Sequence, residues 1–134
     1  MRGQTAFEYM IIAIFVLMFL MPIWVYMSQI QVQTNDEFAL SYAKNAVTQI
    51  VKKSDLVYSQ RLDARIKIDV YIPRGVHYIN VTGNEINMRI LTNAGPVDVF
   101  ETSIAQLQGT LPTNEGLYSI LLKAEGDYVN ITVL

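Results

Sequence analysis

The sequence contains no cysteine and only one histidine, His77. The chain therefore forms no disulfide bond, and it offers neither a thiolate nor a histidine cluster to a metal ion. We expect no cofactor, and we expect His77 to be a surface residue rather than a catalytic base. The acidic residues of the C-terminal half do not follow the spacing of a calcium-binding loop. They are Asp98, Glu101, Glu115, Glu125 and Asp127.

Charged residues are also few. They make up 16% of the 134 residues, and the net charge is −2. No basic stripe is available to neutralise phosphates, so nucleic acid is not an expected partner. No glycine-rich phosphate loop follows a strand-like segment and no catalytic constellation stands out, so we do not expect an enzyme.

One long segment is entirely free of charge. Residues 10–27 read MIIAIFVLMFLMPIWVYM, and with the addition of Ala6 and Phe7 they reach the roughly 20 that cross a bilayer core as a helix. The segment is apolar on all sides, whereas a helix packed on a soluble core has a polar stripe. We therefore predict that residues 4–27 form a transmembrane helix, with Trp24 and Tyr26 near its far interface. Pro22 cannot donate a backbone hydrogen bond, so we expect a kink there.

Basic residues predict the orientation of this helix. Arg2 precedes the apolar run, and the next basic residue after the run is Lys44. The positive-inside rule therefore places the N-terminus in the cytoplasm and everything after Met27 outside the cell.

The residues before the run carry a different signal. An ordinary secretory signal has small residues after its apolar core, whereas bulky residues follow here. The stretch RGQTAFEYMI, residues 2–11, resembles the class III signal of archaeal type IV-like pilins. The resemblance implies that a prepilin peptidase cuts between Gly3 and Gln4. Residues 1–3 would then be a leader peptide, and the apolar helix would stay in the mature chain.

The same resemblance assigns a role to Glu8. It would be the fifth residue of the mature chain, where the family carries its glutamate. The family often has serine where this chain has Ala6, and leucine where it has Ile12. The partners implied by the family are copies of the chain or other pilins, bound through the N-terminal helix. A prepilin peptidase, an assembly ATPase and a membrane platform protein are implied as well.

The physical chemistry of a carboxylate also bears on Glu8. Inserting a charge deep in a bilayer costs about 2.5–3.5 kcal/mol, so Glu8 is expected near the cytoplasmic headgroups. In a bundle of helices the buried charge needs a partner. The free α-amine of Gln4 on a neighbouring subunit, offset by about one turn, would supply it unless the glutamine cyclises. The alternative is a purely interfacial Glu8.

Residues 28–60 are predicted to form an amphipathic stem helix. From Phe38 onward, apolar residues recur at helical spacing while the lysines fall mostly on the other side. We expect the apolar stripe to pack on the domain that follows. The stripe consists of Ala39, Tyr42, Ala43, Ala46, Val47, Ile50 and Val51.

The stem and the transmembrane segment are expected to form one helix. It would run from about Thr5 to Tyr58. The alternative is that a second helix starts near Thr34, because Thr34 and Glu37 have the spacing of a capping box.

The period of the apolar residues changes at Ala64. In RIKIDVYI, residues 65–72, apolar and polar residues alternate as in a half-buried strand. Six further strand-like segments follow, separated by turn residues. They are VHYINV, EINMRIL, VDVF, AQLQGTL, LYSILLK and YVNITVL. The predicted fold class is α+β, with residues 64–134 forming a small antiparallel β-sandwich-like domain or a sheet wrapped on the stem helix. VYIPRGVHYINV also resembles segments that recur in archaeal pilin-like proteins.

Two triplets match the N-glycosylation sequon. They begin at Asn80 and Asn130. Each asparagine alternates with apolar neighbours along its strand, so both side chains are expected to face outward. Either could accept a glycan outside the cell; ordinary exposed strand residues are the alternative.

The expected function is structural. The resemblance implies a major or minor subunit of an archaeal type IV-like pilus, assembled through its N-terminal helix and used for surface adhesion. The precursor would be a single-pass membrane protein and the product an extracellular filament. The alternative is a non-polymerising single-pass membrane protein with an outer β domain, such as an accessory component of the archaellum.

Overall fold

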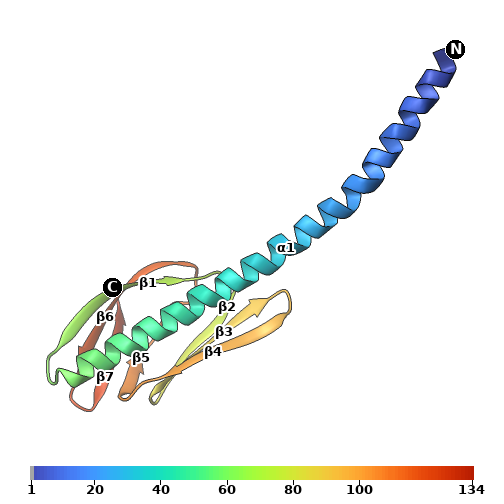
Figure 1. The fold of residues 1–134 in the computed structure, drawn as a ribbon. Coiled ribbons are helices and arrows are strands. Elements are labelled where there is room, and N and C mark those ends of the chain that lie inside the picture. Colours follow the sequence, from blue (N-terminus) through green and yellow to red (C-terminus); the bar gives the residue numbers. More distant parts are fainter. Residues whose placement is uncertain (1) are drawn as a thin grey trace. The chain divides into compact units, whose positions relative to one another are not determined.

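The computed structural model describes residues 2–134 and contains one helix followed by seven strands in this range (Figure 1). The chain divides after Asn35 into two compact units, so residues 36–59 of the helix belong with the strands. The elements are α1 (Arg2–Ser59), β1 (Arg65–Ile72), β2 (Val76–Thr82), β3 (Glu85–Thr92), β4 (Gly95–Thr102), β5 (Gln106–Gly109), β6 (Gly116–Ala124) and β7 (Tyr128–Val133). The predicted α+β class and all seven predicted strands are confirmed.

A single helix, α1, covers both the apolar segment and the stem. Residues 31–37 are helical, so a fresh start at Thr34 is wrong and the prediction of one helix is confirmed. The reason lies in composition, because no glycine or proline occurs between Pro22 and Ser59 to break the helix. The helix ends where Arg61 and Asp63 adopt positive φ angles of 72° and 65°, the left-handed conformation common at helix C-termini.

The strands form two sheets. One has the order β1-β6-β7-β5 and the other the order β2-β3-β4. All pairings are antiparallel except that of β5 with β7, which is parallel and had not been expected. The sheets meet near the β2–β3 turn, where the Leu107 amide of β5 donates to the Gly83 carbonyl at 2.7 Å.

The core of the second unit lies between one face of α1 and the inner faces of both sheets. The strands contribute alternate residues, as their patterns predict. This shared core matches a sheet wrapped on the stem helix better than a sandwich of sheets alone. The helix contributes Ala43, Ala46, Val47, Ile50, Val51, Ser54 and Val57.

The prediction that Tyr42 belongs to the buried apolar stripe is wrong. Its side chain is 51% exposed, and its ring meets that of Tyr71 edge-on, with centroids 5.3 Å apart. Tyr42 lies one residue before Ala43, and one residue turns an α-helix by about 100°. The tyrosine therefore sits beside the buried face instead of on it.

Two carboxylates of α1 tie the helix to loops of the β domain. Asp36 accepts hydrogen bonds from the backbone amide and side chain of Asn93, at 3.0 and 3.2 Å. Asp55 accepts from the Ser103 hydroxyl at 2.5 Å and the Ile104 amide at 3.1 Å. These contacts anchor the loop before β4 and the loop after it.

The length of α1 between the two carboxylates and the length of the β4 segment are consistent with this attachment. Nineteen helical residues separate Asp36 from Asp55, which is about 28 Å at 1.5 Å per residue. Ten extended residues separate Asn93 from Ser103, which is about 33 Å. Between the two ends, the Thr48 hydroxyl donates to Glu101 at 3.4 Å. The edge strand β4 is therefore held along the helix by side-chain contacts.

Replacing Asp55 tests this attachment. Asp55→Ala leaves the buried Ser103 hydroxyl and the Ile104 amide without their acceptor, and hydrogen bonds to charged groups are each worth about 1.5–3 kcal/mol. We expect the free energy of unfolding to fall by about 2 kcal/mol in chemical denaturation of the full chain in detergent. Lys52→Ala, an exposed change on the same helix, should have little effect. Equal stability of both variants would contradict the role of Asp55.

Candidate functional site

The first unit presents an apolar surface on every side of α1. The large apolar side chains from Phe7 to Met27 are all exposed, with fractions between 38% for Ile11 and 79% for Trp24. This is a helix long and apolar enough, by length and composition, to cross a membrane. The contrast with residues 43–57, where one face is buried, follows directly from the sequence pattern.

Such a surface is not stable in water. Fully burying one large apolar side chain is worth about 1.5–3 kcal/mol, so the eighteen from Phe7 to Met27 together represent on the order of 30 kcal/mol. Soluble monomeric proteins rarely expose apolar patches of more than a few hundred Å². Lipid or other apolar helices around the segment would remove this surface from water.

Three of the predicted site residues lie near the start of this segment. Gly3, Gln4 and Glu8 are exposed and helical. Gln4 and Glu8 are one turn apart, so they share a face of α1. A second copy shifted along the axis by about one turn, some 6 Å, would bring its Gln4 beside this Glu8.

The surroundings of Gly3 show whether the fold requires a glycine at this position. A Cβ added at Gly3 would meet nothing within 4 Å, and Gly3 is not among the glycines with positive φ. Glycine lowers helix stability by about 1 kcal/mol relative to alanine. The fold of the chain therefore gives no reason for glycine at this position.

Pro22 lies inside α1, and the residues on both sides of it are helical. The proline does not end the helix. The kink expected at Pro22 stays a prediction.

The second unit offers no catalytic constellation among the residues that the structure describes. No group of three or more His, Asp or Glu side chains is placed to hold a metal ion in residues 2–134. His77 is exposed, as predicted, and its ring lies edge-on to that of Tyr78 at 5.9 Å. Two of the acidic residues make contacts within the domain: Tyr71 donates to Glu115 at 2.7 Å, and Lys123 pairs with Glu125 at 2.9 Å.

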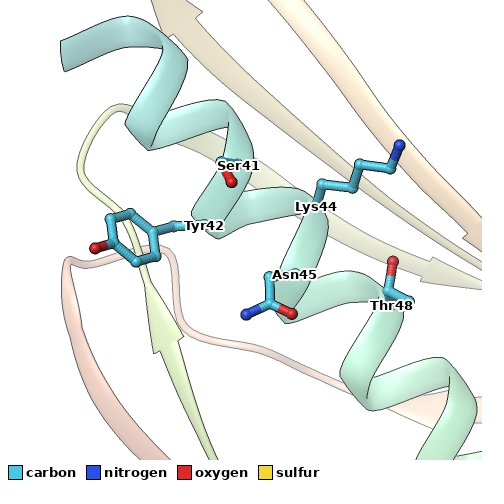
Figure 2. Close-up of a pocket in the computed structure, with 5 residues that line it drawn as sticks. All are labelled: Ser41, Tyr42, Lys44, Asn45 and Thr48. Carbon is cyan, nitrogen blue, oxygen red and sulfur yellow. The ribbon is translucent and has the colours of Figure 1, made fainter. Parts of the chain in front are cut away.

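A hollow of about 370 Å³ on α1 does not change this conclusion. It is lined by five side chains of one helix, which Figure 2 shows spreading in different directions along two turns. Binding sites bring polar groups together on a shared point. These side chains diverge, so no ligand site is assigned to them. They are Ser41, Tyr42, Lys44, Asn45 and Thr48.

The outer face of the β2-β3-β4 sheet carries an ordered row of side chains. Arg89 on β3 binds Asp98 on β4 through two hydrogen bonds of 2.6 Å, and its guanidinium lies 5.2 Å from the ring centre of Tyr78 on β2. The hydrogen bonds from Arg89 lower the pKa of the Asp98 carboxyl below its ordinary value. The sequence shows no signal for this row, because cross-strand neighbours depend on register.

Both predicted glycosylation asparagines lie on outer faces, as expected. Asn80 on β2 is exposed. Asn130 on β7 is half-buried and alternates with the buried Val129 and Ile131. The two residues belong to different sheets, so they do not form one site.

No model of a known protein family matches the chain, and no curated protein or solved structure matches it either.

The lowered pKa of Asp98 predicts a pH dependence of stability. The pair with Arg89 stabilises the fold above the ordinary carboxyl pKa of about 3.9 and is lost as the pH falls through the lowered value. Wild type should therefore unfold at a higher temperature than Asp98→Asn at pH 7, and the difference should shrink as the pH falls through the lowered pKa of Asp98. Asp127→Asn, at an exposed turn, is the control. A difference in melting temperature between wild type and Asp98→Asn that persists in acid would rule out ionisation of Asp98 as its cause.

Proposed function

We propose that this chain is a filament subunit of the archaeal type IV-like pilin kind, assembled through the first part of α1. The observation that carries the proposal is the apolar surface from Phe7 to Met27, which surrounds the helix completely and has one carboxylate, Glu8, near its start. A membrane anchor needs only the apolar surface. The carboxylate is a further feature that a helix bundle can use.

Gly3 supports the processing step of this proposal. Because the fold leaves open space around Gly3, its presence is better explained by recognition outside the folded chain. A prepilin peptidase that cuts between Gly3 and Gln4 is such a recognition. The cut would create a free α-amine at Gln4, one helical turn before Glu8.

Glu8 supports the assembly step. When the helix leaves lipid for a bundle of equally apolar helices, close packing and polar pairing decide the affinity, since the hydrophobic effect contributes little. A carboxylate of one subunit and the amine of the next would then fix how far neighbouring helices are offset. The β domain, exported before assembly, would form the outer surface and make the adhesive contacts.

Processing is tested by the mass of the mature chain. After co-expression with an archaeal prepilin peptidase, we expect the chain to begin at Gln4, with or without cyclisation of the glutamine. Gly3→Val should stay uncut while the β domain keeps its melting temperature, because the added side chain has room. A wild-type chain that retains Met1 under these conditions would contradict the proposal and favour a non-polymerising membrane protein.

Assembly is tested at Glu8. Glu8→Ala should insert into membranes as well as wild type, since it removes a charge from the apolar segment. It should lower the yield of sheared surface filaments by about tenfold or more, because breaking a buried pair costs several kcal/mol. Glu37→Ala, an exposed glutamate of the same helix, is the matched control. Normal filaments from Glu8→Ala, counted by electron microscopy, would remove the proposed role of Glu8.

A further inference from the structure

The two sequons differ in how open their strands are. Asn80-Val81-Thr82 closes β2, which is an edge strand of the three-stranded sheet, and it runs into the turn at Gly83. Asn80 and Thr82 are both exposed. Asn130 lies in β7, which has β6 on one side and β5 on the other. At this turn the Leu107 amide of β5 donates to the Gly83 carbonyl, but Asn80 and Thr82 stay exposed. The first sequon is therefore at the edge of a sheet, and the second is inside a sheet.

The neighbours of Asn130 restrict access further. It lies opposite Lys123 on β6 and opposite Gln108 on β5. The amine of Lys123 is held by Glu125 at 2.9 Å. At Gly109, the next residue of β5, a Cβ would clash with the carbonyl of Ile131. The two strands are thus closely packed, and the Asn130 amide is only partly exposed.

Asn80 lies in a cross-strand row that ends on an open aromatic ring. It is opposite Asn87 on β3, and Asn87 is opposite Phe100 on β4. Two strand spacings, about 10 Å, separate Asn80 from Phe100. Phe100 is 62% exposed, which leaves most of an apolar ring in water.

The adjacent cross-strand row contains the other aromatic ring of this face, and that ring is already in contact with a side chain. There, the ring of Tyr78 is already occupied by Arg89, and Arg89 is held by Asp98. None of the residues that the structure describes is shown covering Phe100 in this way. An apolar ring beside a polar row can bind a molecule that has an apolar face and polar edges.

We propose that Asn80 carries an N-linked glycan whose first sugars lie across Asn87 and onto the ring of Phe100, and that Asn130 stays unmodified. The C–H face of a sugar ring would cover the phenyl group and remove it from water. The glycan would coat the outer face of the β2-β3-β4 sheet. In the cell, this inference rests on the proposed export of the β domain.

The modification is a glycosyl transfer from a polyprenol phosphate- or diphosphate-linked oligosaccharide. The Nδ2 atom of Asn80 forms a bond to C1 of the first sugar while the bond from C1 to the phosphate oxygen breaks. The lipid phosphate leaves, and the Nδ2 proton passes to a base of the transferase. Thr82 is exposed, and its hydroxyl would supply the part of the sequon that the transferase recognises.

Which of the two asparagines is glycosylated can be tested in vitro, where the chain does not have to be exported from a cell. The purified full chain in detergent is incubated with a purified single-subunit oligosaccharyltransferase and its lipid-linked oligosaccharide, and peptides are analysed by mass spectrometry. We expect the glycan on Asn80, none on Asn130, and none at all on Asn80→Gln. Equal modification of both sites, or none on wild-type Asn80, would overturn the inference. Filament formation is measured separately, so failure of the proposed function gives a different result.

The contact with Phe100 is tested by melting temperature. The glycan should raise the melting temperature of wild type by about 3 °C, a shift typical of one modest interaction in a domain of this size. In Phe100→Ala the glycan should raise it by less than about 1 °C. Leu91→Ala is the matched control, because Leu91 is a 54% exposed apolar residue on the same outer face but in another row. The same shift in Phe100→Ala as in Leu91→Ala would overturn the docking.

Discussion

The apolar surface of α1 has to leave water, and the two parts of the helix satisfy this requirement differently. Residues 43–57 have one apolar face, which the inner faces of two sheets bury. Residues 7–27 are apolar on every side apart from Glu8, and their large side chains are exposed. They need lipid or other helices. One element therefore serves as the core of a domain and as a surface that requires a separate environment.

Burial alone does not explain how the β domain is held on the helix. Alanines and valines contribute much of the apolar face of α1, and their burial is not directional. Asp36 and Asp55 add directional contacts by accepting hydrogen bonds from loops at the two ends of β4. A directional contact at each end fixes both position and register, which non-directional burial does not. The same contacts attach an edge strand to the helix, so that it is less available to other chains.

The proposed function depends on residues that the fold leaves unexplained. Gly3 has open space around it, and Glu8 lies in a segment that is otherwise apolar. Phe100 leaves most of an apolar ring in water, outside the core. Gly3 lowers helix stability and Phe100 leaves an apolar ring in water, and all three residues would gain a role in the presence of a second molecule. A peptidase, a neighbouring helix and a glycan are the proposed partners.

The sequence by itself determined the elements of this protein. The apolar run and the helical spacing of the stem predicted a single helix, and alternation predicted seven strands, because both patterns depend on residues close in the chain. The sequence could not place Tyr42, whose position at the margin of a face depends on what packs there. It also missed the parallel pairing of β5 with β7 and the contacts of Asp36 and Asp55. Only the tertiary structure decided these, because pairing, register and loop contacts join residues that are distant in the chain and follow no local pattern.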